Sequence, residues 1–398
     1  MYNLIVKETE QEVLEHFNSL GIEGVGFETT TPNVIWHKIP HDYSQDYLTF
    51  VSKANNNTFL WKARSDENTR TISVSTDNGE TWTDKTSSTG GTVLGVLNNG
   101  DKMLIKGNNT NYGDYDENWH NFFTSTGYYD VEGNIMSLIG GDNFTELTEL
   151  VSGGTFYALF SIWEDTEEPS VSYLQSAGNL VLPATALTYG CYAYLLAYCT
   201  CLTSVPALPA TTLTEECYDS MFEDCTNLTT APELPATTLA YDCYEYMFRG
   251  CTNLTTAPEL PATTLAEDCY YAMFKDCTSL TTAPELPATT LAGWCYEYMF
   301  SGCTSLTTAP ELPATTLADS CYHGMFDDCT SLNYVKCLAS SGMTSTNCLT
   351  IWLSGVASTG TFVKSPNATT GDTAGDSQWR INSANGIPSG WTVVDATS

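Results

Sequence analysis

The sequence predicts an α+β fold with a small N-terminal β module, a solenoid of 26-residue strand/short-helix units and a C-terminal cap. The segment Leu-Thr-Thr-Ala-Pro-Glu-Leu-Pro-Ala-Thr-Thr-Leu-Ala recurs from Leu228, Leu254, Leu280 and Leu306. Each copy is followed by a Cys-Tyr-x-x-Met-Phe-x-x-Cys-Thr block. Units this short cannot bury their own apolar faces, so they must stack on one another.

The first region, residues 1–45, is predicted to be a docking or anchoring segment with a short strand, a helix and irregular chain. Val13, Phe17 and Leu20 recur at helical spacing, and Gly21 is a suitable helix stop. A segment of this size and polarity is too small for a core of its own. We therefore expect it to contact another protein or other copies of the chain.

Residues 46–135 read as a β-sandwich-like module. Short runs rich in β-branched and aromatic residues, separated by turn residues, predict strands at 59–63, 71–75, 92–97 and 102–106. The run from Ser75 to Trp82 matches the Asp-box pattern S-x-D-x-G-x-T-W, which resembles a hairpin turn of sialidases and other glycan-active β proteins. We interpret it as a fold element in which Asp77 caps the turn and Trp82 packs beneath it.

Residues 136–339 are assigned to the solenoid and 340–398 to its cap. Within a unit, Leu254, Ala257 and Leu260 mark an extended side that prolines keep from becoming helical. A short helix is predicted over residues 266–274, with Cys269, Met273 and Phe274 facing inward. Residues 140–177 resemble a degenerate first coil, with an exposed acidic loop at 164–169. In the tail, three tryptophans are expected to cover the last coil: Trp352, Trp379 and Trp391.

The composition narrows the classes of partner. Aspartate and glutamate number 47 against 14 lysines and arginines, for a formal net charge of −33. A surface with this much negative charge repels phosphate backbones and anionic lipid. We therefore expect neither nucleic-acid binding nor membrane-surface binding. No apolar run is long enough to span a membrane, and the N-terminus lacks the pattern of a secretory signal.

All 15 cysteines lie between Cys191 and Cys348, and twelve of them form six pairs with C-x7-C spacing. This spacing fits structural zinc poorly. Stacked, in-register side chains also suit disulfide geometry badly, so buried free thiols and a reducing cytosol are favoured over disulfides. The glutamates Glu233, Glu259, Glu285 and Glu311 also recur once per unit. With one carboxylate per coil, solvated charge is favoured over a calcium-lined stripe.

The Met-Phe-x-x-Cys-Thr-Ser-Leu-Thr-Thr stretch resembles the BspA-like leucine-rich repeat. The repeat sequence with both Cys-Tyr-x-x-Met-Phe and Ala-Pro-Glu-Leu-Pro-Ala-Thr-Thr-Leu resembles a subfamily found in gut bacterial surface proteins and in virion proteins of their phages, including crAss-like phages. The resemblance covers about half the chain and implies a binding or structural protein, because the family has no common catalytic residues. Combined with the cysteines and the missing export signal, it predicts a non-enzymatic head or tail fibre-like virion protein. A bacterial cell-surface adhesin is the alternative, and an accessory module of a glycan-active enzyme a weaker one.

Comparison of the repeat copies locates a candidate ligand surface. The extended side is nearly invariant, whereas the predicted helix side varies and carries aromatic residues, which we expect to be exposed, beside acids. Such a surface suits recognition of host polysaccharide or protein, although neutral drift of a solvent face explains the variation equally well. The candidate residues are Tyr241, Tyr246, Tyr271, Trp294, Tyr298 and His323. No catalytic, cofactor or metal motif was found. Phage fibres are typically homotrimers, so we expect a virion-surface trimer attached through its N-terminal half.

Overall fold

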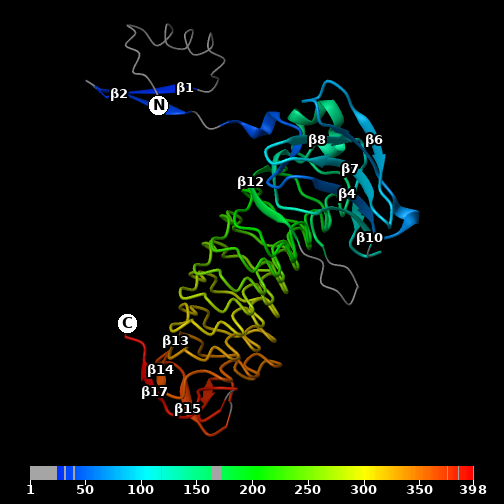
Figure 1. The fold of residues 1–398 in the computed structure, drawn as a ribbon. Coiled ribbons are helices and arrows are strands. Elements are labelled where there is room, and N and C mark those ends of the chain that lie inside the picture. Colours follow the sequence, from blue (N-terminus) through cyan, green and yellow to red (C-terminus); the bar gives the residue numbers. More distant parts are fainter. Residues whose placement is uncertain are drawn as a thin grey trace.

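The computed structural model describes residues 25–30, 33–38, 41–117, 119–162, 172–373, 375–383 and 385–397. The described fold is mainly β and contains no closed barrel. Figure 1 shows a sheet-rich module at one end and an elongated stack of coils that leads to the C-terminus. Within the described residues, regular helix is confined to α2 (Ser137–Gly140) and the 3-10 turns η1 (Tyr43–Gln45), η2 (Asp66–Asn68) and η3 (Gly141–Glu146).

Two sheets pack face to face in the module. The six-stranded sheet has the order β12 (Leu174–Val181), β11 (Tyr129–Asn134), β3 (Leu48–Ser52), β8 (Lys102–Gly107), β5 (Thr71–Ser75) and β6 (Thr83–Thr86). The four-stranded sheet has the order β7 (Thr92–Leu97), β4 (Asn57–Ala63), β10 (Trp119–Ser125) and β9 (Gly113–Asp114). Phe50 joins them, with its ring 5.4 Å from that of Phe59 and 4.9 Å from that of Phe123. All four strands predicted in this region are present, as β4, β5, β7 and β8.

The Asp-box lies at the hairpin between β5 and β6. The Thr81 hydroxyl donates to one Asp77 carboxylate oxygen, and the other oxygen accepts the Ser75 hydroxyl at 2.7 Å and the Thr81 N–H at 2.9 Å. These donors, the Thr81 hydroxyl foremost, lower the pKa of Asp77 to about 2. Gly79 has φ +87°, which the turn requires. Trp82 lies 5.1 Å from the Tyr47 ring and beneath the Lys106 ammonium. These contacts give the motif the turn-building role expected of it.

A further hairpin pairs β1 (Val25–Thr30) with β2 (Asn33–Lys38) antiparallel. Irregular chain was expected here, so this part of the sequence prediction was wrong. The helix expected between residues 8 and 20 and the acidic loop at 164–169 lie outside the described residues.

The short helix predicted in each repeat is replaced by consecutive β-turns. Tyr244, Tyr246 and Phe248 donate their N–H groups to carbonyls of the next coil, at 3.2, 2.9 and 2.9 Å. The N–H groups between them, such as that of Met247, bond three residues back in the same coil. Every fourth residue has a positive φ, +49° at Tyr246, which a right-handed helix cannot contain. Pairing between coils therefore overrides the local helix preference.

The other side of each coil is extended but forms only isolated bridges to its neighbours. Thr256, for example, bridges to Thr230 and to Thr282 in the adjacent coils. Proline has no N–H to donate, so Pro258 and Pro261 prevent a continuous hydrogen-bonded ladder on this side. The predicted extended side is thus present without regular strands.

The core of the stack consists of ladders of identical buried side chains. The tyrosine of each Cys-Tyr-x-x-Met-Phe block stacks on its equivalent one coil away, with ring centroids 5.8 to 6.1 Å apart from Tyr192 to Tyr322. Phe156 continues this aromatic column toward the module, and Trp352 and Trp379 continue it toward the C-terminus. All 15 cysteines are free thiols, and fourteen are buried. Cys251 donates its thiol to the Phe222 carbonyl one coil back, at 3.2 Å.

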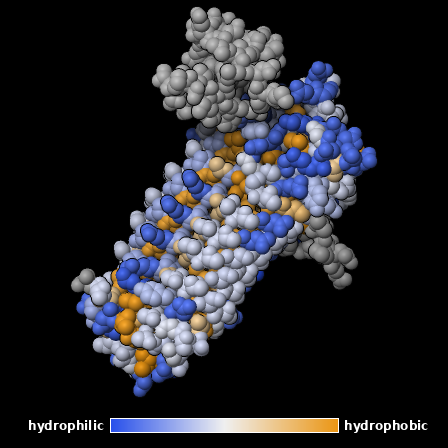
Figure 2. All heavy atoms as spheres, turned by 60° about the vertical axis from the view of Figure 1, so that its left-hand side comes forward, coloured by the Kyte–Doolittle hydropathy of each residue, from blue (hydrophilic) through white to orange (hydrophobic). Residues whose placement is uncertain are grey.

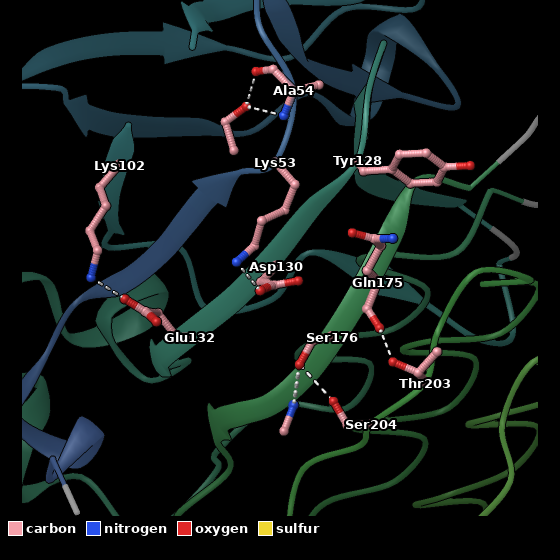
Figure 3. Close-up of polar contacts among 12 residues, drawn as sticks. Lys53, Ala54, Lys102, Tyr128, Asp130, Glu132, Gln175, Ser176, Thr203 and Ser204 are labelled. Carbon is pink, nitrogen blue, oxygen red and sulfur yellow. Dashed lines mark hydrogen bonds and ion pairs between the residues drawn. The ribbon is translucent and has the colours of Figure 1, made fainter. Parts of the chain in front are cut away.

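Strand β12 belongs to both the module and the stack. It pairs in parallel with β11, while its Ser176 bridges to Ser204 of the following coil with the two hydroxyls 2.6 Å apart. Figure 3 shows this junction, where the Gln175 carbonyl accepts the hydroxyl of Thr203. Beside it, ion pairs join Asp130 and Glu132 of β11 to Lys53 after β3 and to Lys102 of β8. The turn residues 154–160 also bond to the next coil, so the degenerate first coil continues the six-stranded sheet into the repeats.

The last coil is covered by a parallel sheet of β13 (Tyr334–Cys337), β14 (Gly360–Lys364) and β17 (Trp391–Asp395). The chain between β14 and β17 forms a separate two-stranded sheet of β15 (Thr369–Gly371) and β16 (Gln378–Arg380). Trp352 and Trp379 are fully buried, and Trp391 is nearly so, with its indole N–H donating to the Ala357 carbonyl at 2.8 Å. The three tryptophans therefore close the apolar interior of the stack.

Candidate ligand surface

Four of the six candidate residues form one continuous row along the turn side of the stack. The Tyr246 and Tyr271 ring centroids are 5.2 Å apart, those of Tyr271 and Tyr298 are 6.2 Å apart, and those of Tyr298 and His323 are 5.0 Å apart. All four side chains are half-buried. We expected the tyrosines to be exposed, and this was wrong because each ring covers its neighbour in the next coil.

The two remaining candidates are the exposed ones. Tyr241 is 43% exposed and Trp294 is 39% exposed, and they occupy adjacent repeat positions two coils apart. No ring contact joins either residue to the tyrosine row among the described aromatic pairs. The structure thus separates the predicted surface into a packed row and two free-standing aromatic side chains.

Small residues make room for the row. Tyr246, Ala272, Tyr298 and Gly324 occupy the same repeat position in four successive coils, so large and small side chains alternate. A Cβ added at Gly324 would lie 2.3 Å from the Tyr298 ring. The Tyr298 ring therefore extends over Gly324 of the next coil, and a large side chain there would collide with it. This two-coil alternation is readable in the sequence and was missed.

Carboxyl groups lie beside the rings with few cations to neutralise them. Burial and neighbouring acids raise the pKa of Asp242 to about 7 and that of Glu245 to about 9. One oxygen of Glu297 is 3.1 Å from Nδ1 of His323, while its other oxygen is buried without a partner. Asp242 and Glu297 are buried beside the rings, whereas the carboxylates of Glu215 and Glu267 are exposed on the same side of the stack.

Two basic residues of the repeat stack, Arg249 and Lys275, support the same row. The Arg249 guanidinium lies 5.1 Å from the Tyr246 ring centroid and donates to Glu223 at 3.1 Å. The Lys275 ammonium lies 5.2 Å from the Tyr298 ring centroid. Both cations therefore hold tyrosine faces in place.

A second aromatic cluster, which sequence reasoning missed, lies where the module meets the stack. Tyr115, from the loop after β9, contacts the rings of Tyr157, Tyr189 and Tyr194 at 5.6 to 6.4 Å. Its hydroxyl donates to the buried carboxylate of Asp219 at 2.8 Å. The sequence indicated this cluster in part, because Tyr194 shares its repeat position with Tyr246 and Tyr298. No sequence pattern marks Tyr115 as a member of the cluster.

The turn side offers flat aromatic faces and carboxyl acceptors, which together suit a polyhydroxylated ligand. Within the part of the chain that the structure describes, no three histidine, cysteine, aspartate or glutamate side chains are grouped to hold a metal ion. No helix among the described residues is long and apolar enough to cross a membrane.

Comparisons of the chain with protein-family profiles, with characterised proteins and with solved structures gave no significant match.

Proposed function

We propose that the chain is a non-enzymatic structural and adhesion protein of a phage virion, a head or tail fibre-like component that binds the host surface. Its repeat stack is a BspA-like leucine-rich-repeat solenoid in this proposal. The observation that carries the proposal is the side-by-side order of the coils, which presents variable aromatic and acidic residues on a nearly invariant core. Repeat scaffolds of this kind commonly present extended binding surfaces.

The ligand in this proposal is a host-surface polysaccharide or protein. Tyr241 and Trp294 supply exposed rings for stacking on sugar faces, and neighbouring carboxyls accept hydroxyl hydrogen bonds. Fourteen buried free thiols favour synthesis in a reducing cytoplasm over export as a bacterial surface protein. Other virion proteins, contacted through the N-terminal half, are the proposed assembly partners.

Mass spectrometry of purified phage particles and of host envelope fractions from the source community tests this assignment. We expect peptides of this chain in the particles, co-sedimenting with capsid or tail proteins. Recovery from envelopes alone would overturn the virion assignment and favour the adhesin alternative.

A further inference from the structure

An open groove runs along the extended side of the first coils, away from the tyrosine row. It consists of three neighbouring cavities of about 490, 380 and 330 Å³. The largest shares Ala231, Pro232 and Glu233 with one neighbour and Gly178, Ala207 and Pro209 with the other. The three hollows therefore form one continuous feature, which we call the proline groove.

The lining of the proline groove combines apolar rings with acidic edges. Seven of the lining residues are prolines, at positions 183, 206, 209, 232, 235, 258 and 261, and Glu233 and Glu259 are exposed beside them. Among the residues that the structure describes, the lining contains no lysine or arginine, and its one histidine, His41, is 2.5 Å from the Asp46 carboxylate. Figure 2 shows evenly spaced hydrophilic residues along one edge of the stack, with apolar residues beside them.

A contact within the chain shows which kind of side chain can bind to this surface. Glu311 occupies the same repeat position as Glu233 and Glu259, three and two coils further along the stack. Lys336 places its ammonium 2.9 Å from the Glu311 carboxylate, and only 30% of that lysine side chain is exposed. A lysine can therefore lay its methylene stem on the apolar surface and pair its charge with this glutamate.

We propose that the proline groove binds an extended, lysine-bearing polypeptide segment of a partner protein. Alternate residues of an extended chain are about 6.6 Å apart, close to the 5.5 to 6.1 Å between equivalent rings of successive coils. Lysines at alternate positions would thus meet one glutamate per coil. The formal net charge of −33 attracts such a segment over longer range.

The test measures fluorescence anisotropy of a labelled peptide of alternating lysine and threonine titrated with the full chain. The double variant E233Q/E259Q keeps the side-chain shape and removes both charges, and we expect binding about fivefold weaker, as for two modest ion pairs. Its matched control, E215Q/E267Q, removes two exposed carboxylates from the turn side and should bind like the parent.

A steric variant tests the groove separately from its charge. Ala207 is exposed and lines two of the three hollows, so A207W should fill their junction and weaken binding with every glutamate retained. Equal loss in both glutamine variants would show unspecific charge attraction and overturn the proposal. Unchanged binding by E233Q/E259Q, or by A207W, would overturn it as well. Thermal melts of each variant verify that the fold is retained.

Discussion

At the scale of single residues, the smallest side chains of the turn side decide where the tyrosine rings can lie. Gly324 has φ +57° and faces the Tyr298 ring, and Gly250 and Gly302 face Asp224 and Asp276 in the same way. At Gly324 the reason for glycine is steric, because Tyr246, Ala272 and Tyr298 adopt a φ of +47° to +53° at the same repeat position, whereas a Cβ on Gly324 would meet the Tyr298 ring. The alternation of large and small residues is therefore a packing requirement of the stack.

Replacing Gly324 with alanine should destabilise the protein by about 1–3 kcal/mol, because the new methyl group meets the Tyr298 ring at a backbone angle that alanine disfavours. Denaturant unfolding measures the change. Gly90→Ala is the control, since nothing lies within 4 Å of its added Cβ. If Tyr298→Ala recovers none of the loss in G324A, the steric explanation is wrong.

The buried carboxyls predict an unusual pH dependence. Burial raises the pKa of Asp219 to about 8 and the pKa of Glu245 to about 9, far above their values in an unfolded chain. Between the unfolded and folded values the native state binds more protons, so its stability falls as pH rises. We expect a lower melting temperature at pH 8.5 than at pH 5.5.

The variant Asp219→Asn should flatten that dependence, because asparagine still accepts the Tyr115 hydroxyl and carries no charge. Asp84→Asn is a matched control on the exposed strand β6. A melting temperature that rises with pH in the parent, or an equal slope in D219N, would contradict the assignment of this effect to buried carboxyls.

At the scale of elements, the aromatic column links the module, the coils and the cap. Tyr192 shows that the ring and not the hydroxyl matters there, since its hydroxyl is buried without a partner. The equivalent position of the preceding coil holds Phe156, whose ring stacks on that of Tyr192 at 5.7 Å. A phenyl ring therefore already occupies one position of the column.

Tyr192→Phe should leave stability unchanged or raise it, because it removes an unpaired buried polar group. Tyr192→Ala should lower the free energy of unfolding by about 3–5 kcal/mol, since it opens a cavity in the column. Chemical denaturation of both variants against the parent gives the two numbers. A clear loss in the phenylalanine variant would mean that the hydroxyl has a partner in solution.

The sequence predicted the β module and the stacking of repeats because strand patterns and a fixed 26-residue period are local signals. The turn segment was mispredicted as helix, since the N–H groups of Tyr244 and Tyr246 bond across coils and no local propensity reports such pairing. The tyrosine row was placed on the correct side of the coil, but its burial depends on neighbours 26 residues away. The contact of Tyr115 with Asp219 spans 104 residues and left no sequence signal.

At the scale of the whole molecule, β12 joins the module to the stack, and one apolar core extends from Leu48 in the module to Trp391 in the cap. Polar contacts at the junction add to this continuity, among them the hydrogen bond between the hydroxyls of Ser176 in β12 and Ser204 in the following coil, 2.6 Å apart. A continuous core makes the repeats a rigid extension of the module, which suits the proposed role of holding a binding face away from an attachment point.

The proposed attachment through the N-terminal half predicts a trimer. Light scattering of the full chain should give three times the mass of one chain, whereas a version that starts at Asp46 should give the monomer mass. The shortened version retains strands β3 to β17, so it should still unfold in a cooperative thermal transition. Equal oligomeric states for the two proteins would place assembly elsewhere or exclude it.

The central claim is that the turn side of the repeats recognises a host surface, and binding by the double variant Tyr241→Ala/Trp294→Ala tests it most directly. Both rings are exposed, so the melting temperature should stay within about 1 °C of the parent, because exposed substitutions have small effects on stability. On a glycan array and on host cells, the full chain should bind and the double variant should lose at least tenfold in affinity. Undiminished binding by the variant would contradict the claim.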